Sequence, residues 1–159
     1  MALYRASPED GIAWVTGAST GIGRALAIHL ARSGYTVAAT ARAEDGLASI
    51  TREAEHLEGR IFVFPCDVMD EAGMARTVAS IEKNLGPIVL AVFNAGTYLP
   101  VCGDRLETTN FVRSYRINVF GTLNGLVPIS DRMRDRGFGQ IVVMGSVTSF
   151  FGMPSAAAY

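Results

Sequence analysis

The stretch IAWVTGASTGIG, residues 12–23, joins a short apolar run to three closely spaced glycines. The run Ile12–Thr16 is rich in residues that favour a buried strand. In the segment Gly17-x-x-x-Gly21-x-Gly23, Gly17 permits a tight turn, and Gly23 lets the following helix pack closely against the sheet. A strand, a turn and a helix therefore follow one another here without a linker.

The rest of the chain repeats this alternation of short apolar runs and longer amphipathic stretches, and no linker or internal repeat interrupts it. The alternation predicts an α/β fold, a Rossmann-like doubly wound parallel sheet in strand order 3-2-1-4-5, within one domain over residues 1–159. The expected strands, all buried on both faces, are Ile12–Thr16, Thr36–Thr40, Ile61–Pro65, Ile88–Phe93 and Gln140–Met144. The expected helices are Ile22–Ser33, Glu44–Leu57, Glu71–Leu85 and Thr108–Arg136. The fifth strand would lie at an edge of the sheet.

The composition of the chain restricts the kinds of molecule that the protein is expected to bind. The 159 residues are 49% hydrophobic and 18% charged, with a net charge of −1, which argues against nucleic acid or an anionic membrane as the partner. Met1–Asp10 lacks the apolar region of a signal peptide, and no run approaches the roughly 18 apolar residues that span a bilayer. We therefore expect a cytoplasmic protein that acts on a small molecule, with reduced thiols at Cys66 and Cys102 and no metal site.

The glycine loop has the features of a phosphate-binding turn. Gly21 lets the backbone approach a pyrophosphate without a Cβ clash, and the helix N-terminus offers unpaired N–H groups and the positive end of its dipole. The alternative is a glycine-rich turn that serves packing alone. We favour dinucleotide binding because a buried strand precedes the loop and a helix follows it. The expected contacts are Gly17, Ser19, Thr20, Gly21, Ile22 and Gly23.

Two residues far from this loop complete a family pattern. Ser146 ends the last apolar run, and Tyr159 follows it by thirteen residues. With the loop at 16–23, they resemble the catalytic Ser and Tyr and the cofactor loop of the short-chain dehydrogenases/reductases, over nearly the whole chain from Gly11 onward. The resemblance implies an enzyme that transfers a hydride between NADP(H) and an alcohol or carbonyl substrate. In that family a Lys follows the Tyr by four positions, so the sequence implies a domain truncated before that Lys.

The end of the second strand selects the cofactor. The sequence there is Thr40-Ala41-Arg42-Ala43-Glu44. An acidic residue at this point binds the ribose 2′-hydroxyl of NAD, whereas a cation accepts the 2′-phosphate of NADP. By the resemblance, Ala41 occupies the acidic position and Arg42 the basic one, and a guanidinium suits a phosphate monoester. NADP(H) is therefore favoured over NAD(H), with a solvated helix start as the alternative role of Arg42.

Two further strand ends match the family. Cys66-Asp67-Val68 follows the third strand, and the resemblance implies that Asp67 hydrogen-bonds the adenine amino group while the Val68 backbone contributes beside it. Asn94-Ala95-Gly96 follows the fourth strand, where Asn94 would tie the strand ends together and the small Ala95 and Gly96 would leave room for the ribose. The alternatives are a helix N-cap at Asp67 and a turn former at Asn94.

Reduction of a carbonyl needs a proton donor at its oxygen and a group that holds that oxygen. The resemblance assigns the proton transfer to Tyr159, the hydrogen bond to the substrate oxygen to Ser146, and a proton-relaying water to Asn118. A free phenol has a pKa near 10, so proton transfer at neutral pH needs a nearby positive charge, which the Lys supplies in the family. Singly, each residue has an ordinary role, as a loop residue, a terminus or a solvated helix position. Their order and spacing together favour a catalytic site.

Other readings stay open. A non-catalytic NADP(H)-binding module and an inactive truncated fragment are the rivals of an enzyme. The complete chain is expected to form a homo-oligomer, because family members commonly pair through the long helix that holds Asn118 and through the next helix. The following side chains fit an apolar substrate pocket or the core equally well: Thr148, Phe150, Phe151 and Met153.

Overall fold

The structure is a computed structural model that describes residues 4–159. Its strands are β1 (Ile12–Thr16), β2 (Thr36–Thr40), β3 (Arg60–Val63), β4 (Ile88–Phe93) and β5 (Gln140–Val143). Its α-helices are α1 (Gly21–Arg32), α2 (Glu44–Glu53), α3 (Glu71–Leu85), α4 (Thr108–Tyr115) and α5 (Gly121–Arg136). A π-helix, η1 (Arg116–Phe120), joins α4 to α5, and a 3-10 helix, η2 (Val147–Ser149), follows β5.

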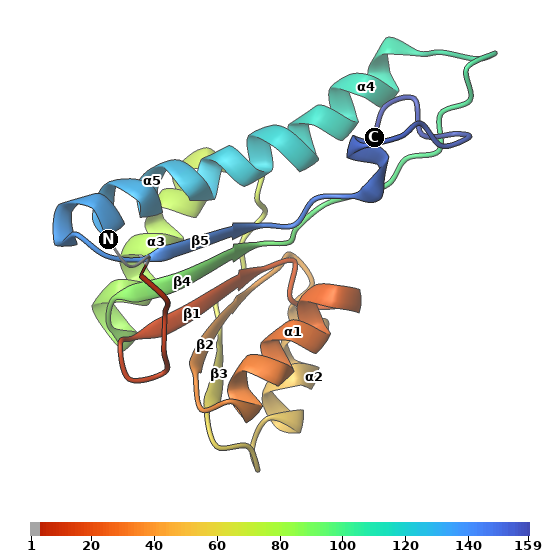
Figure 1. The fold of residues 1–159 in the computed structure, drawn as a ribbon. Coiled ribbons are helices and arrows are strands. Elements are labelled where there is room, and N and C mark those ends of the chain that lie inside the picture. Colours follow the sequence, from red (N-terminus) through yellow and green to blue (C-terminus); the bar gives the residue numbers. More distant parts are fainter. Residues whose placement is uncertain (1–3) are drawn as a thin grey trace.

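The sheet has the predicted topology. All five strands are parallel, and their order is β3-β2-β1-β4-β5, which confirms the Rossmann-like fold. Figure 1 shows α1 and α2 on one face of the sheet and α3 and α5 on the other. Because the strands are parallel, their carboxyl ends lie at one edge of the sheet, where ligands bind in such folds. Within residues 4–159, no helix is both long and apolar enough to cross a bilayer.

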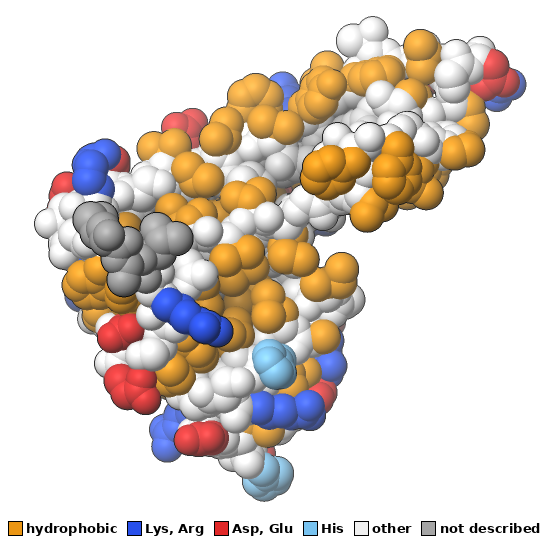
Figure 2. All heavy atoms as spheres, in the orientation of Figure 1, with side chains coloured by type: hydrophobic (Ala, Val, Ile, Leu, Met, Phe, Trp, Pro, Cys, Tyr) orange, Lys and Arg blue, Asp and Glu red, His pale blue; other side chains and the backbone are white. Residues whose placement is uncertain are grey.

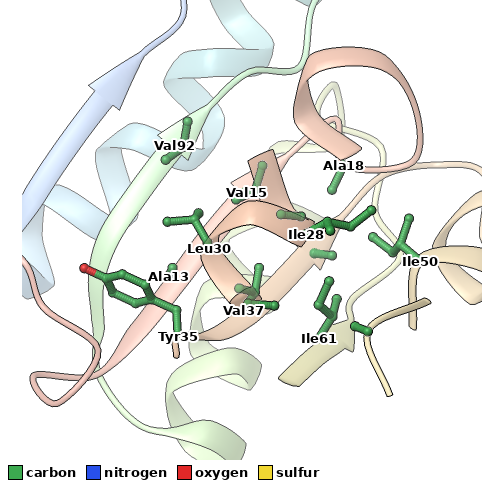
Figure 3. Packing of buried hydrophobic residues seen from close by; sticks show 14 of the residues in the cluster. Ala13, Val15, Ala18, Ile28, Leu30, Tyr35, Val37, Ile50, Ile61 and Val92 are labelled. Atoms are coloured by element: carbon green, nitrogen blue, oxygen red, sulfur yellow. The ribbon is translucent and has the colours of Figure 1, made fainter. Parts of the chain in front are cut away.

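A buried apolar layer holds α1 and α2 against the sheet. Val15 of β1 and Val37 of β2 pack with Ile28 of α1 and Ile50 of α2 in this layer (Figure 3). Alternate residues of each strand point to opposite faces, so the neighbours of these valines face α3 and α5. The central strands are therefore buried on both faces, as the apolar runs predict.

Trp14, the only tryptophan of the chain, lies on the opposite face of β1 and is fully buried. Its indole Nε1 donates a hydrogen bond to Thr40 Oγ1 at 2.9 Å. Its ring packs edge-on against Phe93, with the ring centroids 5.5 Å apart. The buried indole N–H thus has a partner, and the indole is fixed beside the carboxyl end of β2.

The prediction that all five strands are buried on both faces is wrong for β3 and β5. Phe62 of β3 is 39% exposed, and Val143 of β5 is 55% exposed. Both strands lie at edges of the sheet, where the helices that cover the central strands do not reach across both faces. An apolar run therefore does not distinguish an edge strand from a central one.

The long helix predicted for Thr108–Arg136 is interrupted. The π-helix η1 occupies its middle, and Asn118 lies within it. The Thr122 hydroxyl donates to the Asn118 carbonyl oxygen at 2.9 Å. A π-helical turn takes in one residue more than an α-helical turn, so α4 and α5 present different sets of residues to the sheet than an uninterrupted helix would.

Glu82 of α3 joins α3, α5 and the start of β4. Its carboxylate accepts hydrogen bonds from Arg132 at 2.9 Å, from Arg136 at 2.7 Å and from the backbone N–H of Ile88 at 3.0 Å. Arg136 also donates to the Ile88 carbonyl. Burial alone would raise the pKa of this carboxyl, but the hydrogen bonds from Arg136 and Ile88 and the charge of Arg136 hold the pKa below its usual range. The Glu82 side chain is only 13% exposed, so a largely buried carboxylate links these three elements.

Candidate cofactor and active site

A cavity of about 680 Å³ opens at the carboxyl ends of β1, β2, β3 and β4. It contains every predicted dinucleotide-binding residue except Gly23, whose expected role is in packing. The predicted residues that line it are Gly17, Ser19, Thr20, Gly21, Ile22, Arg42, Asp67, Val68, Asn94, Ala95 and Gly96. The fold therefore brings four separate strand ends to one cavity.

The glycine loop leaves its backbone open to this cavity. Gly17 has a φ of +67°, and Gly21 has a φ of +55°. No atom lies within 4 Å of the position that a Cβ on Gly21 would take, so this backbone faces free space. The helix α1 begins at Gly21 with no side-chain cap and no acidic residue in its first turn. Its first N–H groups and its positive dipole end thus fit an anionic group such as a pyrophosphate.

Gly23 serves the packing of α1 on the sheet. A Cβ there would overlap the Gly17 carbonyl oxygen and Asn94 Nδ2. Changing Gly23 to alanine is expected to lower the free energy of unfolding by about 1–3 kcal/mol, because the loop backbone must shift, and to weaken dinucleotide binding. Chemical denaturation measures the first effect. The control is Gly103→Ala, since no atom lies within 4 Å of a Cβ on Gly103. Equal unfolding free energies for the two variants would contradict this role.

Asn94 connects the ends of β1 and β4. Its Nδ2 donates to the carbonyl oxygens of Thr16, at 3.2 Å, and Gly17, at 3.4 Å. The backbone N–H groups of Asn94 and Ala95 both donate to Thr16 Oγ1 at 3.1 Å. The side chain therefore ties the strand ends together, as expected, and does more than form a turn.

Arg42 and Asp67 face one another across the cavity mouth. Their closest side-chain atoms, Nη1 and Oδ2, are 4.0 Å apart, and the Arg42 side chain is 70% exposed. Asp67 is not the N-cap of α3, because that cap is Asp70, whose Oδ1 accepts from the Gly73 N–H at 2.9 Å. Asp67 instead accepts from the Met69 N–H at 3.0 Å through Oδ1. Both charged groups are thus available to a ligand.

The Asn118 side chain links the loop after β4 to the long helix by hydrogen bonds. Its Oδ1 accepts from the Thr97 N–H at 2.7 Å, and its Nδ2 donates to the Thr97 carbonyl at 2.9 Å and to Ser114 Oγ at 3.2 Å. The side-chain amide is therefore engaged on both sides within the protein. The expected role in holding a water stays a prediction.

Tyr159 packs against the residue that follows Thr97. Its ring lies edge-on to Tyr98, with centroids 5.3 Å apart. The Tyr98 hydroxyl donates to the Ser155 carbonyl at 3.0 Å, and the Val101 N–H donates to the same oxygen at 2.8 Å. Asn118 and Tyr159 thus both contact the loop at residues 97–98. Neither of them lines the large cavity, and neither does Ser146.

Ser146 lies half-buried after β5, where its Oγ accepts from the Thr148 N–H at 3.2 Å. The apolar residues beyond it are not core, because Phe150 is 87% exposed and Phe151 and Met153 are also exposed. Figure 2 shows hydrophobic side chains gathered on this part of the molecule and along the long helix above it. The core reading of these residues is therefore wrong, and the pocket reading stays a prediction.

Two helical residues of the cavity wall were not predicted as binding residues. Arg113 of α4 and Ile117 of η1 line the cavity together with Thr97. Arg113 and Ile117 are four positions apart, which is the spacing of one helical face, and Ile117 directly precedes Asn118. This four-residue spacing was the sequence signal from which Arg113 and Ile117 could have been predicted. The other wall residues outside the predicted binding set are Ala41, Ala43, Cys66 and Thr97.

Cys66 and Cys102 are both free thiols. Among residues 4–159, no group of three His, Cys, Asp or Glu side chains is placed to hold a metal ion. The arrangement therefore offers glycine backbone, the exposed guanidinium groups of Arg42 and Arg113, and polar strand ends to an organic anion.

Comparisons with known proteins agree with this geometry. The chain is 35% identical to 2,3-dihydro-2,3-dihydroxybenzoate dehydrogenase of Bacillus subtilis, over 95% of this chain and 58% of that protein. It is 33% identical to an acetoacetyl-CoA reductase of Shinella zoogloeoides, over 93% of this chain and 60% of that protein. An alcohol dehydrogenase of Thermococcus sibiricus, solved in complex with 5-hydroxy-NADP, superimposes with a TM-score of 0.86 at 29% identity, over 94% of this chain and 63% of that one.

The chain spans about 60% of the length of the relatives it matches. The family model described as short chain dehydrogenase matches residues 11–159. That match takes in the glycine loop, the strand ends around the cavity and the segment that carries Ser146 and Tyr159. The chain therefore belongs to the short-chain dehydrogenase family.

Proposed function

We propose that this chain is an oxidoreductase domain that binds NADP(H) and transfers a hydride between it and an alcohol or carbonyl substrate. The observation that carries the proposal is the cavity at the strand ends, which gathers the glycine loop, Arg42, Asp67 and Asn94 around one space. The bound nicotinamide would supply the hydride chemistry. The chain's own residues would bind the cofactor, orient the substrate and move a proton.

Arg42 would give the preference for NADP(H). It follows β2 at the cavity, and the residue before it, Ala41, offers no carboxylate to a ribose 2′-hydroxyl. Its guanidinium is exposed and pairs only loosely with Asp67, so a phosphate would not have to break a strong ion pair. A planar guanidinium can make two hydrogen bonds to such a phosphate.

Changing Arg42 to alanine is expected to raise the dissociation constant for NADPH about 10- to 100-fold and to leave that for NADH nearly unchanged. A hydrogen bond to a charged group contributes about 1.5–3 kcal/mol, which corresponds to this factor. The measurement is energy transfer from Trp14, the single tryptophan, to the bound reduced nicotinamide. The control is Arg134→Ala, because Arg134 is equally exposed, at 71%, but lies on α5. Equal losses for both cofactors would rule out the phosphate contact.

The proposed reaction uses Tyr159, Ser146 and Asn118. Tyr159 would exchange the proton with the substrate oxygen, and Ser146 would donate a hydrogen bond to that oxygen. Asn118 holds the Thr97 backbone in the loop that also supports Tyr159. The exposed apolar side chains Phe150 and Phe151 would face an apolar part of the substrate. The relatives named above include a dehydrogenase of a dihydroxy compound and a reductase of a β-keto thioester, so both compound types belong in a substrate panel.

A non-catalytic NADP(H)-binding module is the second candidate, because Ser146 and Tyr159 do not line the cofactor cavity. Binding of NADPH without turnover of any member of the panel would favour it.

The long helix supports the proposed homo-oligomer. It exposes an apolar stripe at spacings of three and four residues, which is the pattern of a helix that packs against another surface. The stripe consists of Val112, Tyr115, Val119, Leu123 and Val127.

A further inference from the structure

The helical wall of the cavity ends in a charged residue. Ile117 and Arg113 lie one turn apart on this wall. Further along the same helix, Gly121 and Gly125 are buried, and a Cβ on Gly121 would lie 2.7 Å from Val68 Cγ2. One side of the helix therefore packs on the protein at Gly125 and Gly121 and then continues outward over the cavity. The outermost residue on this side is Arg113.

The π-helix η1 explains why Arg113 lies on this side. At about 100° per residue, Arg113 and Gly125 would be about 120° apart around the axis of an uninterrupted α-helix. A π-helical turn takes in about one extra residue, which reduces the angle between them to about 20°. The turn at Arg116–Phe120 thus directs Arg113 to the same side as the buried glycines.

Arg113 is the cavity's cation without an internal partner. The other charged residues that line the cavity, Arg42 and Asp67, face each other at 4.0 Å. Within residues 4–159, no carboxylate lies within ion-pair distance of Arg113, and its side chain is exposed. A cation held over a cavity in this way is available to a ligand.

Another part of the cavity wall, Asp67-Val68, is fixed to the same helix. Asn124 Nδ2 donates to the Val68 carbonyl at 2.8 Å, and the Val68 side chain packs on Gly121. The segment Asp67-Val68 and the helix therefore form two walls that cannot separate freely. A flat group between them would meet the guanidinium plane on one side, and guanidinium planes stack favourably on aromatic rings.

We propose that Arg113 binds the adenine of the dinucleotide from the helical side of the cavity, opposite Asp67 and Val68. This inference rests on the proposed function. It separates the two arginines by role, because Arg42 would distinguish NADP(H) from NAD(H), whereas Arg113 would strengthen the binding of both. A residue that contacts adenine contributes equally whether or not the ribose carries a 2′-phosphate.

The test compares Arg113→Ala and Arg113→Lys with the wild-type protein by energy transfer from Trp14. The alanine variant is expected to raise the dissociation constants for NADPH and NADH by one common factor of about 3- to 30-fold. Displacement of NADPH by 2′,5′-ADP should show the same loss, because this compound carries the adenosine half alone. The lysine variant should recover little, since an ammonium lacks the planar face. The matched control is Arg116→Ala, an exposed arginine on the next turn that does not line the cavity.

Three results would overturn the inference while the proposed function stands. Affinities in Arg113→Ala equal to those of the Arg116→Ala control would remove Arg113 from the site. Recovery by lysine would indicate a phosphate contact, and a loss for NADPH alone would place Arg113 at the 2′-phosphate. Wild-type protein that binds neither dinucleotide would overturn the proposed function together with this inference.

Discussion

Changing Tyr159 to phenylalanine is expected to lower carbonyl-dependent oxidation of NADPH about 100- to 10,000-fold, the usual contribution of a positioned acid or base. The change removes the phenolic proton and keeps the ring, so the edge-on packing on Tyr98 is retained. Tyr159 does not line the cofactor cavity, so the affinity for NADPH should stay within about twofold of the wild-type value. Steady-state rates with a ketone and a β-keto thioester, together with the energy-transfer titration, measure the two quantities.

The control is Tyr98→Phe. This variant removes the hydroxyl that donates to the Ser155 carbonyl but keeps the ring that Tyr159 contacts, and the Val101 N–H still donates to the same oxygen. Its rate should therefore fall far less than that of Tyr159→Phe. A Tyr159→Phe variant as active as the wild type would assign the proton to another group. If the wild type binds NADPH but does not oxidise it with any of the tested carbonyl compounds, the protein is a non-catalytic binding module.

Changing Glu82 to alanine is expected to lower the free energy of unfolding by about 3–5 kcal/mol, because it leaves Arg136, whose side chain is only 17% exposed, without its carboxylate partner. The carboxylate joins Arg132, Arg136 and the Ile88 N–H, so its removal frees α5 from α3 and from the start of β4. Urea denaturation measures the change. The control is Glu53→Ala, which breaks the exposed pair with Arg24 and should cost about 1 kcal/mol or less. Similar reductions in the free energy of unfolding for Glu82→Ala and Glu53→Ala would contradict this stabilising role of Glu82.

The Glu82 interaction should also depend on pH. The pKa of this carboxyl is lowered in the folded protein from its ordinary value of 4.5, so the unfolded chain takes up its proton at a higher pH than the folded chain does. The contribution of the carboxylate to stability is therefore complete above about that ordinary value. It is lost as the pH falls from there through the lower folded pKa. The variant Glu82→Gln should lack this part of the acid sensitivity, and an unchanged acid profile would contradict the assignment.

The sequence predicted which residues lie at the strand ends of the cavity better than it predicted the helical wall. The positions of Gly17, Gly21 and Asn94 follow from strand ends that the apolar runs mark clearly, and parallel strands necessarily bring those ends together. Arg113 was not predicted because the side of the helix on which it lies depends on the π-helix η1. The residue pattern of Thr108–Arg136 does not predict a π-helical turn. The burial of β5 was overestimated for a related reason, since exposure at Val143 depends on which strand lies at the edge. Local pattern thus gives the elements, whereas tertiary packing decides which face each of them shows.

The cavity walls and the reacting residues occupy consecutive parts of the chain. The walls come from residues 17–117, and Asn118, Ser146 and Tyr159 all follow. Because a chain leaves the ribosome from its N-terminus, the nucleotide-binding segment emerges before β5 and before Tyr159. A ligand that binds the folded state stabilises it by mass action, so the proposed dinucleotide would stabilise a part of the chain that leaves the ribosome before Tyr159 does.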